Sequence, residues 1–307
     1  MKTLLAILFL TLPYFQRPDE NNGILYFSLD NGNSWQNKSD GLPENVSLTD
    51  FAITENGINI STKQHGIFLY DFQNSRWAPL TAQPITTDNI DAIHFYHNKL
   101  FAGTQHSGVF VSADKGKTWS SMSSGLKNLT IRKLKAFYNK FYAATNEGLY
   151  SFNEVSQIWT LEFNKKNLQV NGITSLDDEI YIGTTQGVFK SKKNQSEWKQ
   201  VLANRSLHNI GTDGKNIYAL TYGELFKSGD KGIIWTSDQK GMPDGMYTFH
   251  VVPKDKILLA AQWDGVYKKM QSGWVLSSKG LPHSFPVTEL AVYQNIIIAS
   301  GSDWEKK

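Results

Sequence analysis

The chain has 307 residues, of which 13% are aromatic and none is cysteine, so no disulfide can stabilise the fold. Its formal net charge is only +3, and its 31 basic side chains are scattered, which argues against nucleic-acid binding. The 24 glycines outnumber the 9 prolines, and this balance, together with the aromatic content, favours a turn-rich all-β protein.

The first predicted element is a signal-like segment at the N-terminus. Lys2 precedes an apolar stretch, residues 4–12, which has about the length of a signal-peptide core and is short for a membrane span. We therefore expect residues 1–22 to be a signal-like segment and short leader, and residues 23–307 to form the folded domain. The protein is then an exported one, periplasmic or extracellular in a bacterium, without a transmembrane segment. A first hydrophobic strand or an uncleaved anchor is the alternative interpretation of this stretch.

One motif recurs along the rest of the chain. SLDNGNSW (28–35), SADKGKTW (112–119) and SGDKGIIW (228–235) keep Ser, Asp, Gly and Trp at the same offsets, and four weaker copies also end in tryptophan. In six of the seven copies an aromatic residue lies nine positions before the tryptophan. The motif tryptophans, spaced 37 to 42 residues apart, are Trp35, Trp77, Trp119, Trp159, Trp198, Trp235 and Trp274.

Each period contains four short strand patterns. In 88–119 the runs IDAIHFY, LFAGT and GVFVS are separated by polar turns, and a tight turn precedes a fourth strand. Four strands in roughly 40 residues are typical of a propeller blade. The first copy lacks its two leading strands, whereas 285–304 carry two such strands without the rest of a blade. The sequence therefore predicts one all-β, seven-bladed β-propeller with four-stranded antiparallel blades, closed by N- and C-terminal strands that share one blade.

The recurring octapeptides resemble the Asp-box, or bacterial neuraminidase repeat, of sialidases, sortilin-type receptors and photosystem II assembly factors. The resemblance implies that each motif lies in the turn between the third and fourth strands, away from the ligand side. The residue chemistry also favours a structural role, because Asp can accept N–H groups of its own turn, Gly permits a positive φ, and Trp can pack between blades. The predicted structural residues are Ser28, Asp30, Gly32, Trp35, Ser112, Asp114, Gly116, Thr118, Trp119, Ser228, Asp230, Gly232 and Trp235. A calcium loop would need more oxygen ligands, so we predict neither a metal nor a cofactor.

Propellers bind ligands on the face that carries the blade-linking loops and the loops between second and third strands. Trp263 and Trp304 are the two tryptophans outside the repeat, and each adjoins an aspartate. This pairing suits a sugar ring or a cationic side chain, with ordinary packing at the rim as the alternative. The ligand-binding candidates on these loops are His65, His106, Glu147, Gln186, Tyr222, Trp263, Asp264, Asp303 and Trp304.

A second, shorter repeat, which we call the Gly-Leu/Met echo, occupies four blade-linking loops. It reads SDGLP (39–43), SSGLK (123–127), QKGMP (239–243) and SKGLP (279–283). Glycine followed by Leu or Met predicts a turn with one apolar side chain packed onto the blade, which is a structural feature.

The chain lacks the catalytic residues that a sialidase resemblance would require. Those enzymes hold the substrate carboxylate with three arginines, but of four arginines here Arg17 precedes the propeller and Arg76 lies in a motif turn. A glycosidase pair could come from Asp264, Asp303, Glu224 and Glu147, although no local pattern marks any of them as an acid. We therefore predict no catalytic residue, and a monomer that binds a protein segment or a glycan on its loop-rich face. The alternatives are a glycoside hydrolase or sialidase-like enzyme using rim carboxylates, and an assembly or scaffold factor for an envelope or membrane complex.

Overall fold

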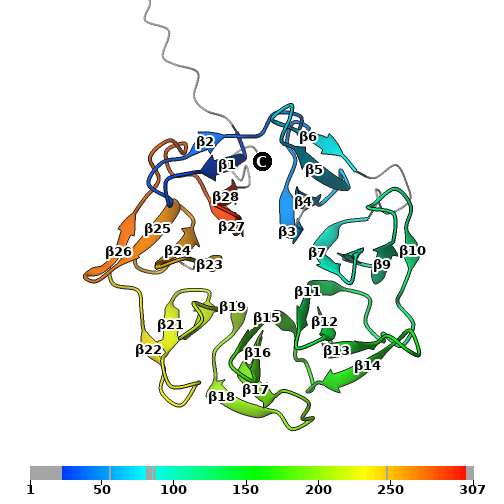
Figure 1. Cartoon of the computed structure of the whole chain (residues 1–307). Coiled ribbons are helices and arrows are strands. Elements are labelled where there is room, and N and C mark those ends of the chain that lie inside the picture. The colour runs from blue at the N-terminus through cyan, green and yellow to red at the C-terminus, as the bar shows by residue number, and fades with distance from the viewer. Residues whose placement is uncertain (1–22, 55–56, 81–84, 86–87, 247, 302–307) are drawn as a thin grey trace, which may run out of the picture.

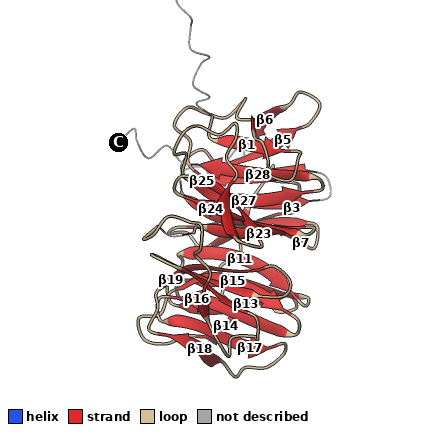
Figure 2. Ribbon diagram, turned by 90° about the vertical axis from the view of Figure 1, so that its left-hand side faces the viewer, coloured by secondary structure: helices blue, strands red, loops and turns tan. Residues whose placement is uncertain are grey.

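The computed structural model describes residues 23–301, apart from 55–56, 81–84, 86–87 and 247. Seven four-stranded antiparallel sheets stand in a ring around a central axis (Figure 1). The predicted seven-bladed β-propeller is thus confirmed, and the side view shows its strands stacked around that axis (Figure 2). None of the described residues belongs to a helix with the length and apolar character of a membrane span. The signal-like segment lies outside the described residues.

Every blade contributes one strand to each of four concentric layers. The strands nearest the axis are β3 (Leu48–Thr54), β7 (Ile90–Tyr96), β11 (Ile131–Phe137), β15 (Val170–Leu176), β19 (Leu207–Thr212), β23 (His250–Lys254) and β27 (Val287–Tyr293). The second strands are β4 (Gly57–Thr62), β8 (Lys99–Thr104), β12 (Lys140–Thr145), β16 (Glu179–Thr184), β20 (Ile217–Thr221), β24 (Ile257–Gln262) and β28 (Ile296–Gly301). The third strands are β5 (Ile67–Asp71), β9 (Val109–Ser112), β13 (Gly148–Asn153), β17 (Gly187–Lys192), β21 (Leu225–Ser228), β25 (Gly265–Met270) and β1 (Leu25–Ser28). The outermost strands are β6 (Arg76–Pro79), β10 (Ser120–Ser121), β14 (Ile158–Phe163), β18 (Lys199–Ala203), β22 (Thr236–Ser237), β26 (Gly273–Leu276) and β2 (Gln36–Asn37).

The two ends of the chain meet in one blade, as predicted. Blade 1 consists of β27, β28, β1 and β2, and each later blade takes the next four strands, from β3–β6 in blade 2 to β23–β26 in blade 7. Strand β1 pairs antiparallel with β28, with Leu25 opposite Ser300 and Ser28 opposite Ile297. This pairing of distant segments within blade 1 closes the ring, so that neither β1 nor β28 is left as a free sheet edge.

The connections between strands fall on two opposite faces, because successive strands of a blade run antiparallel. The blade-linking loops and the loops between second and third strands share one face, which we call the loop-rich face. The turns between first and second strands and between third and fourth strands share the other, which we call the turn face. The Ser-Asp-Gly-Trp motifs lie on the turn face.

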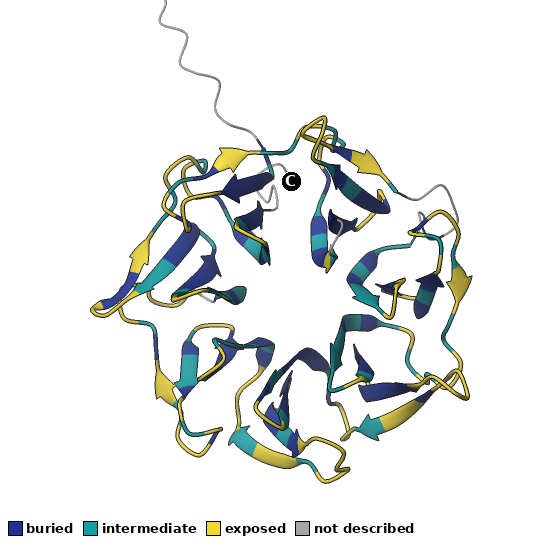
Figure 3. Ribbon diagram, in the orientation of Figure 1, coloured by how far each residue is buried: buried dark blue, intermediate teal, exposed yellow. Residues whose placement is uncertain are grey.

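The hydrophobic core is divided among the seven seams between successive blades. Each of the seven buried clusters combines residues of two neighbouring blades. Four of the clusters contain a buried motif tryptophan, and a partly buried motif tryptophan packs against each of the other three. Trp77 of blade 2, for example, packs with Phe27 of blade 1, and Trp274 of blade 7 packs with Tyr218 of blade 6. Figure 3 shows that burial is greatest on the second strands, lower on the innermost strands that face the axis, and lowest on the outermost strands. The tryptophans therefore join blades to one another.

Most motif tryptophans also form a hydrogen bond across the seam. Five indole N–H groups donate at 2.7–2.9 Å to a carbonyl of the preceding blade or its linker. The pairs are Trp35 with Ser277, Trp77 with Lys38, Trp159 with Met122, Trp235 with Val201, and Trp274 with Asp238. The Trp119 indole instead donates to Gly116 of its own turn at 3.0 Å.

The four linkers with the Gly-Leu/Met echo hold the tryptophan of the next blade. After β2, the Asp40 carbonyl accepts the Trp77 backbone N–H at 2.7 Å, and Leu42 packs in the same cluster. Gly41 has a φ of +87° and lies so close to Trp77 that a Cβ would collide with its carbonyl oxygen. The linkers before Trp159, Trp274 and Trp35 repeat this geometry. Among the described tryptophans these four have at most 3% exposure, so the echo has the structural role that its sequence predicts.

A single carboxylate organises each complete Ser-Asp-Gly-Trp turn. In blade 3, Asp114 Oδ1 accepts the Ser112 hydroxyl at 2.7 Å, while the Thr118 hydroxyl donates to Asp114 Oδ2 at 2.6 Å. The hydrogen bonds from Thr118 are the main cause of the lowered pKa of Asp114. Gly116, at φ +90°, donates its N–H to Ser112 Oγ at 2.7 Å. Blades 1 and 6 repeat the arrangement around Asp30 and Asp230. These carboxylates bind their own turns, on the face opposite the loop-rich one.

Candidate functional site at the mouth of the loop-rich face

The loops between second and third strands are held by a repeated threonine at the end of the second strand. Each threonine Oγ1 donates to a carbonyl across its loop at 2.7–3.0 Å. The same oxygen accepts a loop N–H at 2.9–3.2 Å. The five threonines are Thr62, Thr104, Thr145, Thr184 and Thr221. Five of the loops are thus anchored at their base, which fixes where their side chains enter the site.

The sequence-predicted ligand-binding candidates on the described loops lie on the loop-rich face. The exposed ones are His65, His106, Glu147 and Tyr222, and the half-buried ones are Gln186, Trp263 and Asp264. Asp303 and Trp304 lie outside the described residues. The structure thus brings the described candidates to one face, although they are distributed around its rim.

Three of these candidates are engaged with neighbouring groups. His106 Nδ1 lies 3.4 Å from Asp88 Oδ1, and Gln186 Nε2 donates to the Lys166 carbonyl at 2.7 Å. Asp264 Oδ2 accepts the Tyr267 hydroxyl at 2.8 Å. Asp264 is therefore tied to the third strand of its own blade, which gives this carboxylate a structural contact in addition to any ligand role.

Aromatic side chains gather on blades 6 and 7. The ring centroids of His208 and Tyr222 lie 5.4 Å apart, and those of Phe249 and Trp263 lie 5.0 Å apart. The two pairs are neighbours, because the His208 and Phe249 centroids are 6.4 Å apart. Burial lowers the pKa of His208 to about 4, so its ring is neutral near pH 7. We call these four residues the aromatic wall. His208 and Phe249 belong to it although no sequence pattern pointed to them.

Six innermost strands carry a β-bulge at the same place, one residue after the strand begins. A bulge leaves one residue out of the ladder and re-aims its side chain. Because the innermost strands begin at the loop-rich face, the six bulged residues encircle the central axis at that face, a position that we call the mouth. This bulge ring consists of Thr49, Asp91, Arg132, Asn171, His208 and Thr288.

Asp91 cannot form the hydrogen bond that two other residues of the bulge ring donate to the next blade. Thr49 Oγ1 donates to the Ile90 carbonyl of the next blade, and Asn171 Nδ2 donates to the Leu207 carbonyl of the next blade at 2.6 Å. An ionised carboxylate has no hydrogen to donate in this way. Burial raises the pKa of Asp91, against the opposing influence of nearby cations that include Arg132. A carboxyl group with a raised pKa at the mouth is a functional candidate, and the bulge in β7 is what places it there.

Arg132 supplies the positive charge of the bulge ring. Its Nε–H donates to Asn146 Oδ1, and its Nη2 donates to Gln169 Oε1 at 3.4 Å. Burial lowers the pKa of Arg132, while the Tyr222 phenol and Asp91 act in the opposite direction. The guanidinium stays charged, because arginine does not lose its proton in proteins. The mouth therefore combines one fixed cation with an aromatic wall on the blades beyond it.

An ion-pair network crosses the axis below the bulge ring. Lys133 Nζ on β11 lies 3.2 Å from Glu289 Oε1 on β27 and 3.7 Å from Asp50 Oδ1 on β3. His250 Nε2 on β23 lies 3.7 Å from Glu289 Oε2, but burial lowers the pKa of His250, so this imidazole is a neutral neighbour of the ion pairs. Burial favours a lower pKa for Lys133, but the attraction of the two carboxylates outweighs it and raises that pKa. Lys133 thus connects blade 4 with blades 1 and 2 near the central axis.

A hollow of about 600 Å³ opens on the loop-rich face between blades 4 and 5. Five of its nine lining residues are amides, and two are lysines. Two of the amides, Asn146 and Gln169, are the hydrogen-bond partners of Arg132, so the hollow adjoins the mouth. We call it the 4–5 hollow, and its lining residues are Asn128, Asn146, Glu147, Asn164, Lys165, Lys166, Asn167, Leu168 and Gln169.

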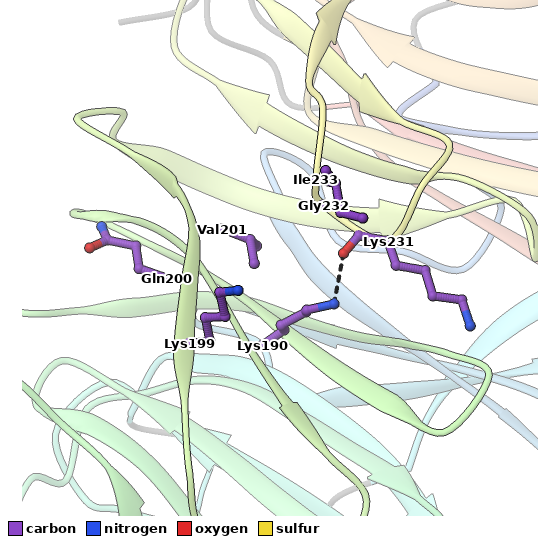
Figure 4. Close-up of a pocket in the computed structure, with 7 residues that line it drawn as sticks. All are labelled: Lys190, Lys199, Gln200, Val201, Lys231, Gly232 and Ile233. Carbon is purple, nitrogen blue, oxygen red and sulfur yellow. Dashed lines mark hydrogen bonds between the residues drawn. The ribbon is translucent and has the colours of Figure 1, made fainter.

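A smaller hollow, of about 280 Å³, lies at the outer side of the seam between blades 5 and 6 (Figure 4). Two of its three lysines are engaged within the protein. Lys190 Nζ donates to the Lys231 carbonyl at 2.9 Å and lies 3.0 Å from Glu179, while Lys231 Nζ lies 2.6 Å from Asp177. These contacts hold the seam together, so we interpret this hollow as part of the scaffold. No group of three His, Asp or Glu side chains in the described part of the chain could hold a metal ion.

Comparison with known proteins places the chain by fold. No protein-family model matches it, and no curated protein matches it. Among solved structures, it is similar to the extracellular domain of the one component system BT4673 from B. thetaiotaomicron, with a TM-score of 0.72 and 16% identity. That match covers 87% of this chain and 38% of that one, so this chain spans well under half of the BT4673 domain.

The chain is also similar to YCF48, in a structure described as YCF48 bound to D1 peptide. The TM-score is 0.66 at 12% identity, and the match covers 87% of this chain and 95% of that one. YCF48 from Cyanidioschyzon merolae gives the same TM-score at 14% identity, with 86% and 98% covered. At such identities these likenesses show the propeller fold.

Proposed function

We propose that this propeller is a non-catalytic recognition module that binds an extended protein segment across the mouth of its loop-rich face. The observation that carries the proposal is the convergence there of the bulge ring, the aromatic wall and the 4–5 hollow. An extended peptide offers N–H and C=O groups to amide side chains such as those of the hollow. Apolar side chains of the same peptide can pack on the aromatic wall.

Two further observations support a segment as the ligand. The YCF48 structure contains a D1 peptide, so a propeller of similar fold accommodates a peptide. Trp263, the predicted platform for a sugar ring, packs edge-on against Phe249 and is half-buried, which reduces the ring face available for stacking. A glycan is therefore the less favoured ligand of the two that the sequence predicts.

We also propose that the protein is exported and that its turns are Asp-boxes. The signal-like segment and the extracellular BT4673 domain of similar fold support export. The carboxylate-centred turns of blades 1, 3 and 6 support the Asp-box assignment. An assembly or scaffold role in an envelope complex is one form that segment binding could take, with the bound segment belonging to a subunit of that complex.

A glycoside hydrolase is the second candidate, because burial raises the pKa of Asp91 at the mouth. A protonated carboxyl there could serve as an acid if a second carboxylate faced it across a bound sugar. Turnover of an aryl glycoside that disappears in Asp91→Asn, Asp264→Asn or Asp303→Asn would establish this function. We expect no turnover by the wild-type protein.

An array of immobilised peptides from the envelope proteins of the source organism, with a glycan array beside it, tests the main proposal. We expect the protein to bind a subset of the peptides, and Tyr222→Ala to weaken that binding about tenfold. Val155→Ser is the matched control, because Val155 is 97% exposed in a third-to-fourth-strand turn on the opposite face. Equal affinity of the wild-type protein and Tyr222→Ala, or specific binding to glycans alone, would contradict the proposal.

A further inference from the structure

Three amide side chains in the 4–5 hollow have their oxygen atoms already engaged. Asn128 Oδ1 accepts the Thr130 backbone N–H at 3.0 Å. Asn146 Oδ1 and Gln169 Oε1 both accept N–H groups of Arg132. A backbone N–H and a guanidinium can only donate, so the engaged atom of each amide must be its oxygen. The orientation of all three amides is therefore fixed by their partners.

The NH2 ends of these amides are what the hollow offers to a ligand. None of the three NH2 groups donates to an acceptor within the described part of the protein, and all three side chains line the hollow. Asn146 and Gln169 are also polarised by the guanidinium behind them, which makes their N–H groups stronger donors. The hollow therefore presents three N–H donors whose carbonyl ends cannot turn toward a ligand without losing a hydrogen bond.

The charges around the hollow favour an anion. Lys165 and Lys166 are exposed at its rim, and Arg132 lies directly behind two of the amides. Glu147 is the one carboxylate among the lining residues, and it is exposed. Asp91 lies near Arg132, so three cations face two carboxylates in and behind the hollow. The excess positive charge attracts negatively charged ligand groups and repels basic ones.

We propose that the 4–5 hollow binds a carboxylate of the recognised segment, with Asn128, Asn146 and Gln169 as its hydrogen-bond donors. This inference rests on the proposed function and specifies it, because it predicts that the segment carries either an acidic side chain or a free C-terminus at this point. A carboxylate accepts several hydrogen bonds and donates none, which matches three NH2 groups. Arg132 acts here as a positioning residue that orients two of the donors.

Titration of ¹⁵N-labelled protein with three short synthetic peptides tests the site directly. The first carries two internal glutamates and blocked ends, the second carries two glutamines and a free C-terminal carboxylate, and the third carries two glutamines and blocked ends. We expect the side-chain NH2 resonances of Asn128, Asn146 and Gln169 to shift with at least one of the first two peptides, which identifies the source of the carboxylate. No shift with either, or an equal shift with the third, would overturn the proposal.

Conservative variants distinguish a loss of carboxylate binding from a loss of folding. Asn146→Asp and Gln169→Glu keep an oxygen for Arg132 but replace the NH2 donor by an anion, so each should weaken binding of the carboxylate peptide about tenfold or more. Glu147→Gln removes the opposing charge and should strengthen it two- to threefold. Unchanged affinity in the first two variants, with an unchanged unfolding temperature, would contradict the assignment. Should both variants unfold, the wild-type titration and Glu147→Gln still decide it.

The outcome for the carboxylate site is distinguishable from the outcome for segment binding. Peptides that the array selects can be remade with Asn and Gln in place of Asp and Glu and with an amidated C-terminus. If the selected peptides bind equally well after this change, the carboxylate site is wrong and segment binding stands. If no peptide of the array binds the protein, segment binding itself is wrong.

Discussion

Replacing Gly41 by alanine should open the seam between blades 1 and 2. A left-handed φ costs a residue with a Cβ about 1–2 kcal/mol, and Gly41 is at +87°. The added Cβ would also collide with the Trp77 carbonyl oxygen, so the linker must move away from blade 2. That movement removes two hydrogen bonds, from the Trp77 backbone N–H to Asp40 and from its indole to Lys38, each 2.7 Å long. At about 1 kcal/mol for each bond, the total loss is about 3–4 kcal/mol.

Gly214→Ala is the matched control for this change. Gly214 has a similar φ of +83°, but nothing lies within 4 Å of the position of its Cβ, so only the backbone cost of about 1–2 kcal/mol applies. Urea unfolding followed by tryptophan fluorescence should therefore show Gly41→Ala about 2 kcal/mol less stable than Gly214→Ala. Calorimetry should place its unfolding temperature roughly 3–4 °C lower than that of the control. If the two variants agreed within about 0.5 kcal/mol, the role assigned to the Gly-Leu/Met linkers would be wrong.

Three further changes test other parts of the scaffold. Lys133→Met leaves the buried Asp50 and the half-buried Glu289 without their cation and should lower the free energy of unfolding by about 3–5 kcal/mol at pH 7. Because the Asp50 carboxyl group then binds a proton more readily in the folded state, the loss should be smaller in urea unfolding at pH 4.5, and equal losses would refute the ion pairing. Asp114→Asn should lower the unfolding temperature at pH 7. Since folding lowers the pKa of Asp114, the difference from the wild type should shrink below pH 4. A difference that stays constant below pH 4 would contradict the turn geometry. Trp77→Phe should destabilise the protein more than Trp119→Phe. Trp77 is 1% exposed and donates a hydrogen bond across its seam, whereas Trp119 donates to its own turn. If chemical denaturation showed Trp119→Phe to be the less stable variant, the seams would not be the core.

The ring of blades was predictable because its signal is local. Each blade repeats an aromatic, a turn motif and a tryptophan within about ten residues, and the missing leading strands of the first copy appear at the other end of the chain. The Gly-Leu/Met echo was also visible, although the sequence could not show that Gly41 and its counterparts face the tryptophan of the following blade. That contact depends on how two sheets are arranged in space.

The mouth was predictable only in part. The loops between second and third strands could be placed from the blade pattern, which is why Tyr222, Trp263 and Glu147 were expected on this face. Asp91 and Arg132 were not singled out, because a bulge depends on the register with the neighbouring strand. Lys133 and Glu289 are 156 positions apart, so no local pattern around either residue points to the other.

Hydrogen–deuterium exchange of the protein, with and without a saturating peptide selected from the array, tests most directly whether the loop-rich face is the binding face. We expect slower exchange in the backbone at 127–131, 145–148 and 164–170, which surround the 4–5 hollow. We expect no change in the motif turns at 28–35, 112–119 and 228–235. Protection confined to those turns on the opposite face would contradict binding at the loop-rich face.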